Sequence, residues 1–127
     1  EAPTFGSVLL AGVLLKLGGY GFYQVFYEFI NPIWNISIIN YFTLFYVISV
    51  LTIIYANIIV FTQLDIKRTI AYYSVGHIGF VTLGIITNTI EGYSGAIITI
   101  VSHGLSAAGL FFCVGYLYEQ THTRSII

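Results

Sequence analysis

The sequence predicts an all-α protein, a polytopic membrane helix bundle of about four transmembrane helices. Three observations lead to this prediction. Hydrophobic residues make up 57% of the 127 residues and charged residues only 7%, far from the composition of an ordinary soluble domain. The longest uncharged stretches, such as 69–90 and 92–118, can cross a bilayer, which takes about 20 apolar residues in a helix. Almost every charged residue falls in a break between such stretches.

The four spans are placed by the charges and turn residues that separate them. The first and second are separated by a turn-prone cluster with an interfacial tryptophan, made of Asn31, Pro32, Trp34 and Asn35. Charged residues 65–68 separate the second span from the third, and Glu91 separates the third from the fourth. The predicted spans, all within one membrane domain covering residues 1–127, are 3–26, 38–62, 69–90 and 93–118.

The charges also predict how the bundle is oriented. If the four spans alternate in direction, Lys67, Arg68 and Arg124 lie on one side together with both chain ends. The positive-inside rule assigns that side to the cytoplasm or the mitochondrial matrix. The formal net charge is only −1 and no basic nucleic-acid surface appears, so we expect lipid around the chain and no nucleic-acid partner.

Two residue counts add further expectations. The sequence contains no methionine and opens with Glu-Ala-Pro, so we expect an internal piece of a longer product or the product of a split gene. Cys113 is the single cysteine, deep in the fourth predicted span. A disulfide framework and a thiol metal motif are therefore excluded, and we expect Cys113 to be a buried packing residue.

Lys16 lies inside the first predicted span, whereas the other charges lie at span ends. A lysine at the centre of a membrane helix opposes insertion by about 2.5–3.5 kcal/mol. Snorkelling of the ammonium to a headgroup is one explanation, but the central depth makes the reach long. We therefore expect water, a partner group or a role in carrying protons. No carboxylate in the sequence lies at this depth, so a carboxylate partner has to come from another segment or chain.

His77 and His103 place two further titratable side chains at membrane depth. Lys16 lies roughly 20 Å and His77 roughly 12 Å from the positive side, and His103 roughly 15 Å from the other. An imidazole titrates near neutral pH and can accept at one nitrogen while donating from the other, so the three residues predict a proton relay. Two alternatives stay open: a histidine that only bonds a neighbouring helix, and haem ligation by both histidines. Uncharged polar groups that could complete the path are Ser7, Tyr46, Ser49, Thr52, Tyr55, Asn57, Tyr73, Ser74, Thr82, Thr99, Ser102 and Ser106.

Small residues recur along the fourth span at spacings of four, three, four and three. Such a stripe lets membrane helices approach closely, so we expect it to pack and His103, beside it, to face a neighbouring helix. Gly18, Gly19 and Gly21 follow Lys16 and predict a local weakness of the first helix. No phosphate loop, Ser-His-Asp set, carboxylate pair or zinc spacing appears, so no soluble catalytic site is expected. The stripe consists of Gly95, Thr99, Ser102, Ser106 and Gly109.

Three blocks of sequence carry a family resemblance. They are EAPTFGS with LLAGVLLKLGGYG (1–7 and 9–21), DIKRTIAYYSVGHIGF (65–80), and SHGLSAAGLF with YEQTHTR (102–111 and 118–124). In this order they resemble the chain 4 family of antiporter-like, proton-pumping membrane subunits of NADH:ubiquinone oxidoreductase, respiratory complex I. Segment 22–62 is only generically similar.

The resemblance implies part of a fourteen-helix antiporter-like fold, with the four spans matching its eighth to eleventh helices. Lys16 then belongs to the central hydrophilic axis, and His77 and His103 to the water-filled path, so all three are expected to transfer protons. The family's other key groups, on the fifth, seventh and twelfth helices, lie outside this chain. The resemblance implies no metal, cofactor or redox centre in this chain, with FMN and iron–sulfur clusters elsewhere in the complex.

The implied function is part of the proton channel of an enzyme that couples NADH oxidation and ubiquinone reduction to proton transfer. Implied partners are other complex I membrane subunits, including antiporter-like neighbours and whatever chain supplies the missing helices. Frequent Ile, Phe, Tyr and Asn favour the mitochondrial inner membrane, with a bacterial plasma membrane as the alternative. Other functions that stay open are a subunit of a multisubunit sodium/proton antiporter or membrane hydrogenase, and a purely structural membrane subunit.

Two residues depart from the family pattern. Gln120 stands where the family often has arginine, so an ion pair made there by relatives is in doubt. Gly76, just before His77, replaces the usual serine and removes one hydroxyl from the expected path.

Overall fold

A computed structural model describes residues 3–30 and 39–125 of the chain. Every regular element in these ranges is a helix, apart from an isolated bridge between Asp65 and Ser125, which confirms the predicted all-α class. The first span combines α-helical and π-helical segments, and the other three are single α-helices. The elements are α1 (Thr4–Leu9), η1 (Leu10–Leu14, π-helical), α2 (Leu15–Val25), η2 (Phe26–Ile30, π-helical), α3 (Ile39–Thr62), α4 (Ile66–Ile86) and α5 (Ile90–Thr121).

Four helices among the described residues are long and apolar enough to cross a membrane, as the sequence predicted. They cover Thr4–Glu28, Phe42–Thr62, Ile66–Ile86 and Ile90–Thr121. The third begins before its predicted start because Asp65 caps it, and the fourth begins at Ile90 because Thr89 accepts a hydrogen bond from the Gly92 N–H. The predicted turn at Asn31, Pro32, Trp34 and Asn35 lies outside the described residues.

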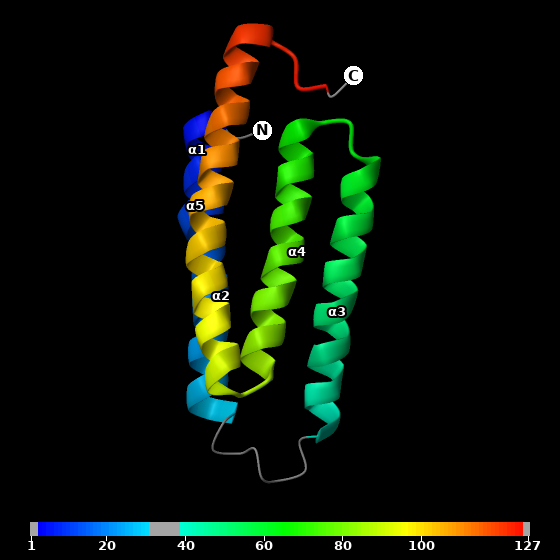
Figure 1. Ribbon diagram of the computed structural model, residues 1–127, viewed down its shortest axis with the longest axis vertical. Helices are drawn as coiled ribbons and strands as arrows, with labels where there is room; N and C mark the ends of the chain where they lie inside the picture. Colours follow the sequence, from blue (N-terminus) through cyan, green and yellow to red (C-terminus); the bar gives the residue numbers. More distant parts are fainter. Residues whose placement is uncertain (1–2, 31–38, 126–127) are drawn as a thin grey trace.

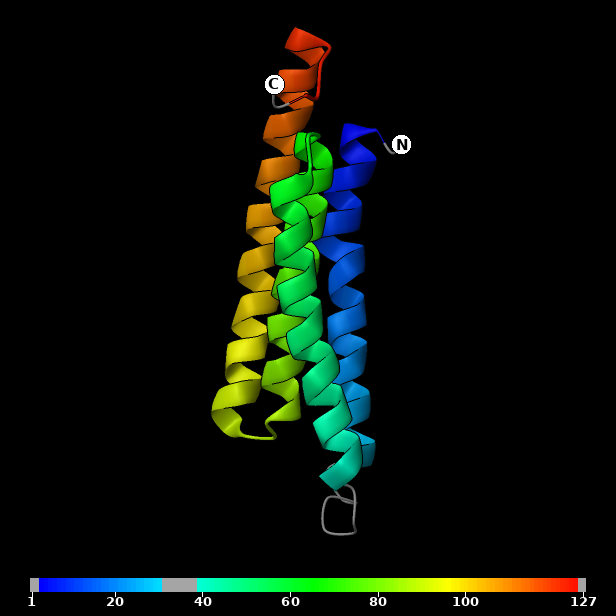
Figure 2. The same ribbon diagram turned by 90° about the vertical axis from the view of Figure 1, so that its right-hand side faces the viewer.

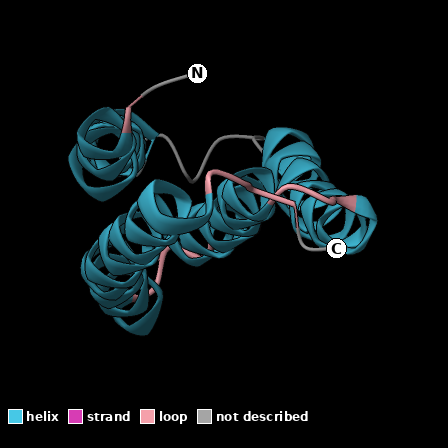
Figure 3. Ribbon diagram, turned by 90° about the horizontal axis from the view of Figure 1, so that it is seen from above, coloured by secondary structure: helices cyan, strands magenta, loops and turns pink. Residues whose placement is uncertain are grey.

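The helices α3, α4 and α5 lie side by side in chain order, and the first span packs across α4 and α5 (Figures 1 and 3). Neighbouring helices in this row run in opposite directions. Both chain ends lie toward the same end of the bundle as the connection between α3 and α4 (Figures 1 and 2). The helices therefore alternate in direction, which is the condition on which the predicted orientation was based.

Apolar side chains form two separate clusters along the bundle. The larger is built on Phe26, Val81, Ile85, Ile86 and Ala96, and the smaller on Ala11, Ala107 and Phe111. The first span, α4 and α5 each contribute residues to both clusters, and Ile70 is the residue of α4 that packs against the smaller one. On each of these helices, the titratable residue lies between its contributions to the two clusters. The apolar packing therefore holds Lys16, His77 and His103 at an intermediate level.

Cys113 is exposed on α5 rather than buried, contrary to the prediction. The buried positions on this part of the helix are Ala107, Phe111 and Gly115, which recur every four residues. Cys113 lies two residues from the last two of these, so the helical period places it on the opposite face.

The helices α3 and α4 are in close contact at Gly79. A Cβ at this position would lie 2.6 Å from Ile53 Cγ1 and 3.3 Å from the Ser49 carbonyl oxygen. The contact is supported by a hydrogen bond of 3.1 Å between the Ser49 and Thr82 hydroxyls. The missing side chain of Gly79 therefore sets the spacing of this helix pair.

Gly79→Ala is expected to destabilise the full-length protein by about 1–3 kcal/mol, because the added methyl group overpacks the contact between α3 and α4. Thermal unfolding of the purified protein in detergent measures the effect. Gly21→Ala is the matched control, since nothing lies within 4 Å of the Cβ it adds, and alanine there favours the helix. Equal melting temperatures for the two variants would contradict this account of the contact.

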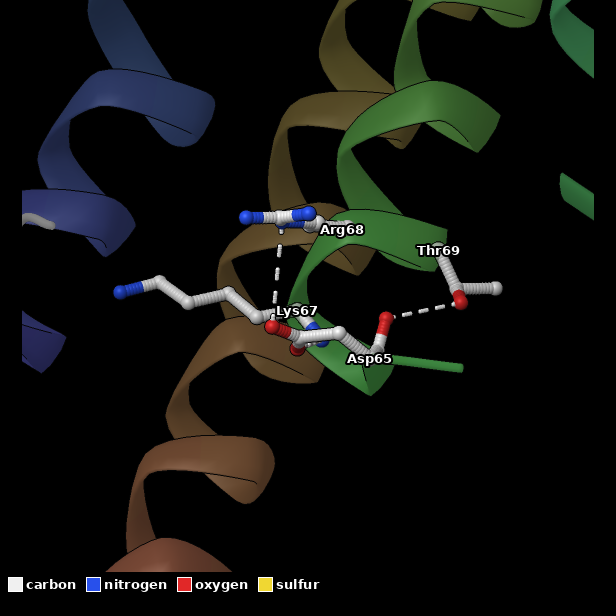
Figure 4. Close-up of polar contacts among 4 residues, drawn as sticks. All are labelled: Asp65, Lys67, Arg68 and Thr69. Atoms are coloured by element: carbon white, nitrogen blue, oxygen red, sulfur yellow. Dashed lines mark hydrogen bonds and ion pairs between the residues drawn. The ribbon is translucent and has the colours of Figure 1, made fainter. Parts of the chain in front are cut away.

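Asp65 caps the start of α4 (Figure 4) and pairs with Ser125 in an isolated bridge. Its Oδ1 accepts a hydrogen bond of 3.0 Å from the Lys67 N–H, and its carbonyl accepts one of 2.9 Å from the Thr69 hydroxyl. The Arg68 guanidinium lies 4.0 Å from the second carboxylate oxygen, and the Ile66 N–H donates to the Arg124 carbonyl over 3.2 Å. The residue is therefore an N-cap with a weak, exposed ion pair.

Asp65→Ala is expected to cost about 1 kcal/mol of stability through loss of the N-cap. Asp65→Asn keeps an acceptor for the Lys67 N–H and removes the charge, so it is expected to retain most of this stability. The same unfolding measurement compares the two variants. An equally large loss in Asp65→Asn would assign the stabilisation to the ion pair instead.

Candidate functional site

The first span brings Lys16 to the site two residues after the end of the π-helical turn η1. Its ammonium donates a hydrogen bond to the Ala11 carbonyl, five residues earlier. Both groups lie inside the apolar helix Thr4–Glu28, so the ammonium bonds backbone within the span rather than reaching a headgroup. Snorkelling is therefore not the conformation that this structure shows.

The irregular part of the first helix precedes Lys16 and does not follow it. The turn η1 covers Leu10–Leu14, whereas α2 runs without interruption through Gly18, Gly19 and Gly21. The prediction that the helix is weakened at these glycines is therefore wrong, because the irregular turn lies before Lys16. Backbone at membrane depth has to satisfy its hydrogen bonds internally, and a helix continuous through the glycines does so. Isolated π-helical turns are frequent at functional sites.

His77 on α4 and His103 on α5 stack against each other. Their ring centroids are 4.9 Å apart and their planes differ by 26°. The Tyr73 ring meets His77 edge-on, with 4.4 Å between the ring centroids. His103 is buried, with 6% of its surface exposed, and its Nε2 has no hydrogen-bond partner among the described residues. A buried polar atom without a partner is costly, so this nitrogen points to a further group at the site.

Lys16, His77 and His103 line one small cavity. Gly19 and Thr99 contribute to its wall, and the space open to the centre of a water molecule is about 10 Å³. That volume is close to the ~10–15 Å³ that one water requires. Lys16 and His77 also lie close enough to His103 to interact with it electrostatically. The three residues predicted from the sequence are therefore brought together, in an arrangement through which a proton could pass by way of one water.

The histidine pair does not fit a haem. Two axial histidines hold an iron by ring nitrogens that face each other across the porphyrin plane. Here the rings stack at 4.9 Å, which leaves no room for a macrocycle between them. Among the described residues there is also no group of three or more His, Cys, Asp or Glu side chains suited to a metal ion.

Most of the other polar side chains at membrane depth are satisfied by their own helix. The hydroxyls of Ser49, Thr52 and Ser106, for example, donate to carbonyls three or four residues earlier. Of the polar residues predicted to complete the path, Thr99 lines the shared cavity and Tyr73 touches His77. The site is therefore smaller than the full set of intramembrane polar residues suggested.

Gly76 and Gln120, the two positions expected to depart from the family pattern, each lie beside another polar side chain. A Cβ at Gly76 would lie 3.5 Å from both Nδ2 and Oδ1 of Asn57. The carboxamide of Asn57, on α3, thus lies beside Gly76. Gln120 donates a hydrogen bond of 2.8 Å to the Tyr116 hydroxyl.

The predicted stripe of small residues is not the packed face of α5. Most of its members, including Gly95, Ser102 and Gly109, are exposed in this chain. The packed face is displaced by one position and carries Ala96, His103 and Gly104, among others. One position is about 100° around a helix, so small residues alone did not identify the contact face. The prediction that His103 faces a neighbouring helix is confirmed.

Two parts of the site were missed by sequence reasoning. One is the π-helical turn with its Ala11 carbonyl, for which the sequence gives no signal. The other is the contact between Gly12 and α5 at Gly104 and Ala108. Gly104 and Ala108 stand four residues apart, a spacing of small residues typical of close helix contacts, so this pair could have been found.

Fold and site together define a class: a polytopic membrane helix bundle with a cluster of titratable side chains at mid-span. The whole chain, residues 1–127, matches the family described as NADH:quinone oxidoreductase/Mrp antiporter, TM, and the chain belongs to this family.

Curated relatives agree with this family. The chain is 46% identical over 126 residues to NADH-ubiquinone oxidoreductase chain 4 of Chondrus crispus, and 50% identical over 127 residues to the protein of that name in Metridium senile. It is 47% identical over 126 residues to NADH-quinone oxidoreductase subunit M of Rickettsia prowazekii. Each match covers 99% of this chain and 25% of the relative. The chain therefore spans about a quarter of the length of these relatives.

Proposed function

We propose that this chain is part of the proton-translocating channel of a respiratory NADH:quinone oxidoreductase, the H⁺-translocating complex I. The observation that carries the proposal is the convergence of Lys16, His77 and His103 on one water-sized cavity inside a bundle of apolar helices. Intramembrane ionisable residues are expensive and mark ion or proton pathways. The choice of enzyme is based on the relatives, which are named as subunits of NADH oxidoreductases.

In this proposal, Lys16 gains and releases a proton as charge shifts in neighbouring parts of the complex. His103 and His77 exchange that proton with the water path, because an imidazole can accept and donate at different nitrogens. The chain holds no redox centre, and electron transfer through FMN and iron–sulfur clusters takes place in other subunits. Proton movement through this chain is then coupled to chemistry elsewhere by electrostatics and conformation.

The proposed partners are other membrane subunits of the complex and the protein segments that supply the remaining helices. The proposed location is the mitochondrial inner membrane, with the bacterial plasma membrane as the alternative, since relatives of both kinds are found. The end that carries Lys67, Arg68 and Arg124 faces the matrix or cytoplasm, in accord with the positive-inside rule.

Purification of the full-length protein from its own membranes tests the proposal. We expect it to copurify with flavin and iron–sulfur proteins, and the sealed membranes to acidify one compartment when NADH is oxidised. Deletion of the protein should abolish this NADH-driven proton movement, and its return should restore it. Recovery without any flavin or iron–sulfur partner would refute the proposal.

A second candidate is a subunit of a multisubunit sodium/proton antiporter, because the family description covers Mrp antiporters as well. Vesicles that contain the full-length protein would then exchange sodium for protons without NADH. That exchange, together with the absence of flavin and iron–sulfur partners, would favour the antiporter over the oxidoreductase.

A further inference from the structure

Gly104 on α5 lies directly against the first span at the site. A Cβ at Gly104 would lie 3.3 Å from the Gly12 carbonyl oxygen and 3.5 Å from Lys16 Cε. From the other side, a Cβ at Gly12 would lie 3.5 Å from the Cβ of Ala108. The backbone of η1 and the aliphatic stem of Lys16 therefore both rest on a part of α5 that has no side chain.

The contact at Gly104 can adjust on the side of Lys16, but has little room to adjust on the side of Gly12. The Gly12 carbonyl belongs to the backbone of the π-helical turn, which is held by the helix, whereas the Lys16 stem is flexible. A methyl group on Gly104 would therefore displace the turn by a few tenths of an ångström, whereas its contact with the Lys16 stem, at 3.5 Å, would be an ordinary one. Ala11 belongs to this turn, so the movement shifts the Ala11 carbonyl relative to the ammonium that bonds it.

Gly104 also stands next to the histidine at the site. His103 and Gly104 are both buried neighbours on α5, and Lys16 and His103 line the same cavity. One turn of α5 thus supplies an imidazole and the surface along which the lysine side chain runs. The geometry of the lysine with respect to His103 is fixed within that turn.

We propose that Gly104 is a positioning residue for Lys16: its missing side chain lets the π-helical turn that carries the Ala11 carbonyl lie against α5, so that Lys16 bonds this carbonyl and lines the cavity shared with His103. The inference rests on the proposed function, because it assigns Gly104 a role in proton transfer through Lys16. Gly104 itself transfers no proton.

The test is Gly104→Ala in the full-length protein within its assembled complex. We expect normal assembly and a loss of proton pumping per NADH oxidised of about three- to tenfold, since a misplacement of about 1 Å can cost about 100-fold. Gly109→Ala on the same helix is the control, because nothing lies within 4 Å of the Cβ it adds. Pumping in Gly104→Ala equal to that in Gly109→Ala would overturn the inference.

A double variant separates positioning from general packing. In a Lys16→Ala background there is no ammonium to position, so Gly104→Ala should cause no further loss of the residual pumping. A further loss by the same factor as in the wild-type background would show that Gly104 acts independently of Lys16 and would overturn the inference. Normal pumping by Lys16→Ala alone would instead overturn the proposed function.

Gly12→Ala is a second control, on the other side of the same contact. Its added Cβ makes only ordinary contact with Ala108, so the complex should form and pump like the wild type. Failure of Gly104→Ala to assemble, while Gly12→Ala and Gly109→Ala assemble normally, would show that Gly104 serves packing rather than positioning and would overturn the inference.

Discussion

Replacement of Lys16 by alanine is expected to lower proton pumping per NADH oxidised by about 100-fold, the lower end of what a positioned proton-transfer group contributes. Lys16 is the charged side chain at the centre of its span, its ammonium bonds the Ala11 carbonyl, and the residue lines the cavity that His77 and His103 share. Removal of a lysine from mid-membrane also removes an insertion cost of about 2.5–3.5 kcal/mol. Assembly should therefore persist while pumping is lost.

Lys16→Arg separates charge from proton transfer. Arginine keeps the positive charge but does not release its proton in proteins. A purely structural role, in which the charge is paired for assembly, predicts that arginine preserves function, whereas the relay predicts that it fails almost as badly as alanine. Leu17→Ala, at the next and exposed position, controls for local packing. Near-normal pumping by an assembled Lys16→Ala complex would rule out the relay.

The fold was largely accessible from the sequence because lipid imposes simple rules. A span needs length and low charge, and its backbone has to be satisfied internally, so long apolar stretches with few charges located all four helices. The ends were less accurate. Side-chain caps at Asp65 and Thr89 determine where α4 and α5 begin. A hydropathy pattern does not reveal such hydrogen bonds.

The identities of the site residues were predictable, but the geometry was not. A lysine and two histidines at membrane depth stand out against apolar neighbours, because each is costly there. Which of them touch depends on helix rotation, and an error of one residue is about 100°. That is why the stripe of Gly95 and Gly109 was mistaken for the packed face, while Gly104 was overlooked. The π-helical turn at Leu10–Leu14 was not predicted, because the sequence gives no signal for it.

His103→Phe is expected to lower pumping by about tenfold without lowering stability. The Nε2 atom of His103 is buried and has no partner among the described residues, and such an atom costs about 1–3 kcal/mol. Phenylalanine removes that cost and keeps a ring to stack on His77. If His103 served only to bond a neighbouring helix, the same change would instead destabilise the protein. Pumping assays and thermal unfolding on the same preparation distinguish the two roles.

His103→Gln and His122→Phe complete this comparison. Glutamine keeps a donor and an acceptor but does not titrate, so it should pump as poorly as phenylalanine if the imidazole has to carry the proton. His122 follows the end of α5, away from the cavity, and its replacement should leave pumping unchanged. The expected loss at His103 is smaller than at Lys16, because His77 stacks on the same ring and offers a second imidazole to the proton. Full activity in His103→Gln would mean that hydrogen bonding alone, without protonation of this side chain, sustains the path.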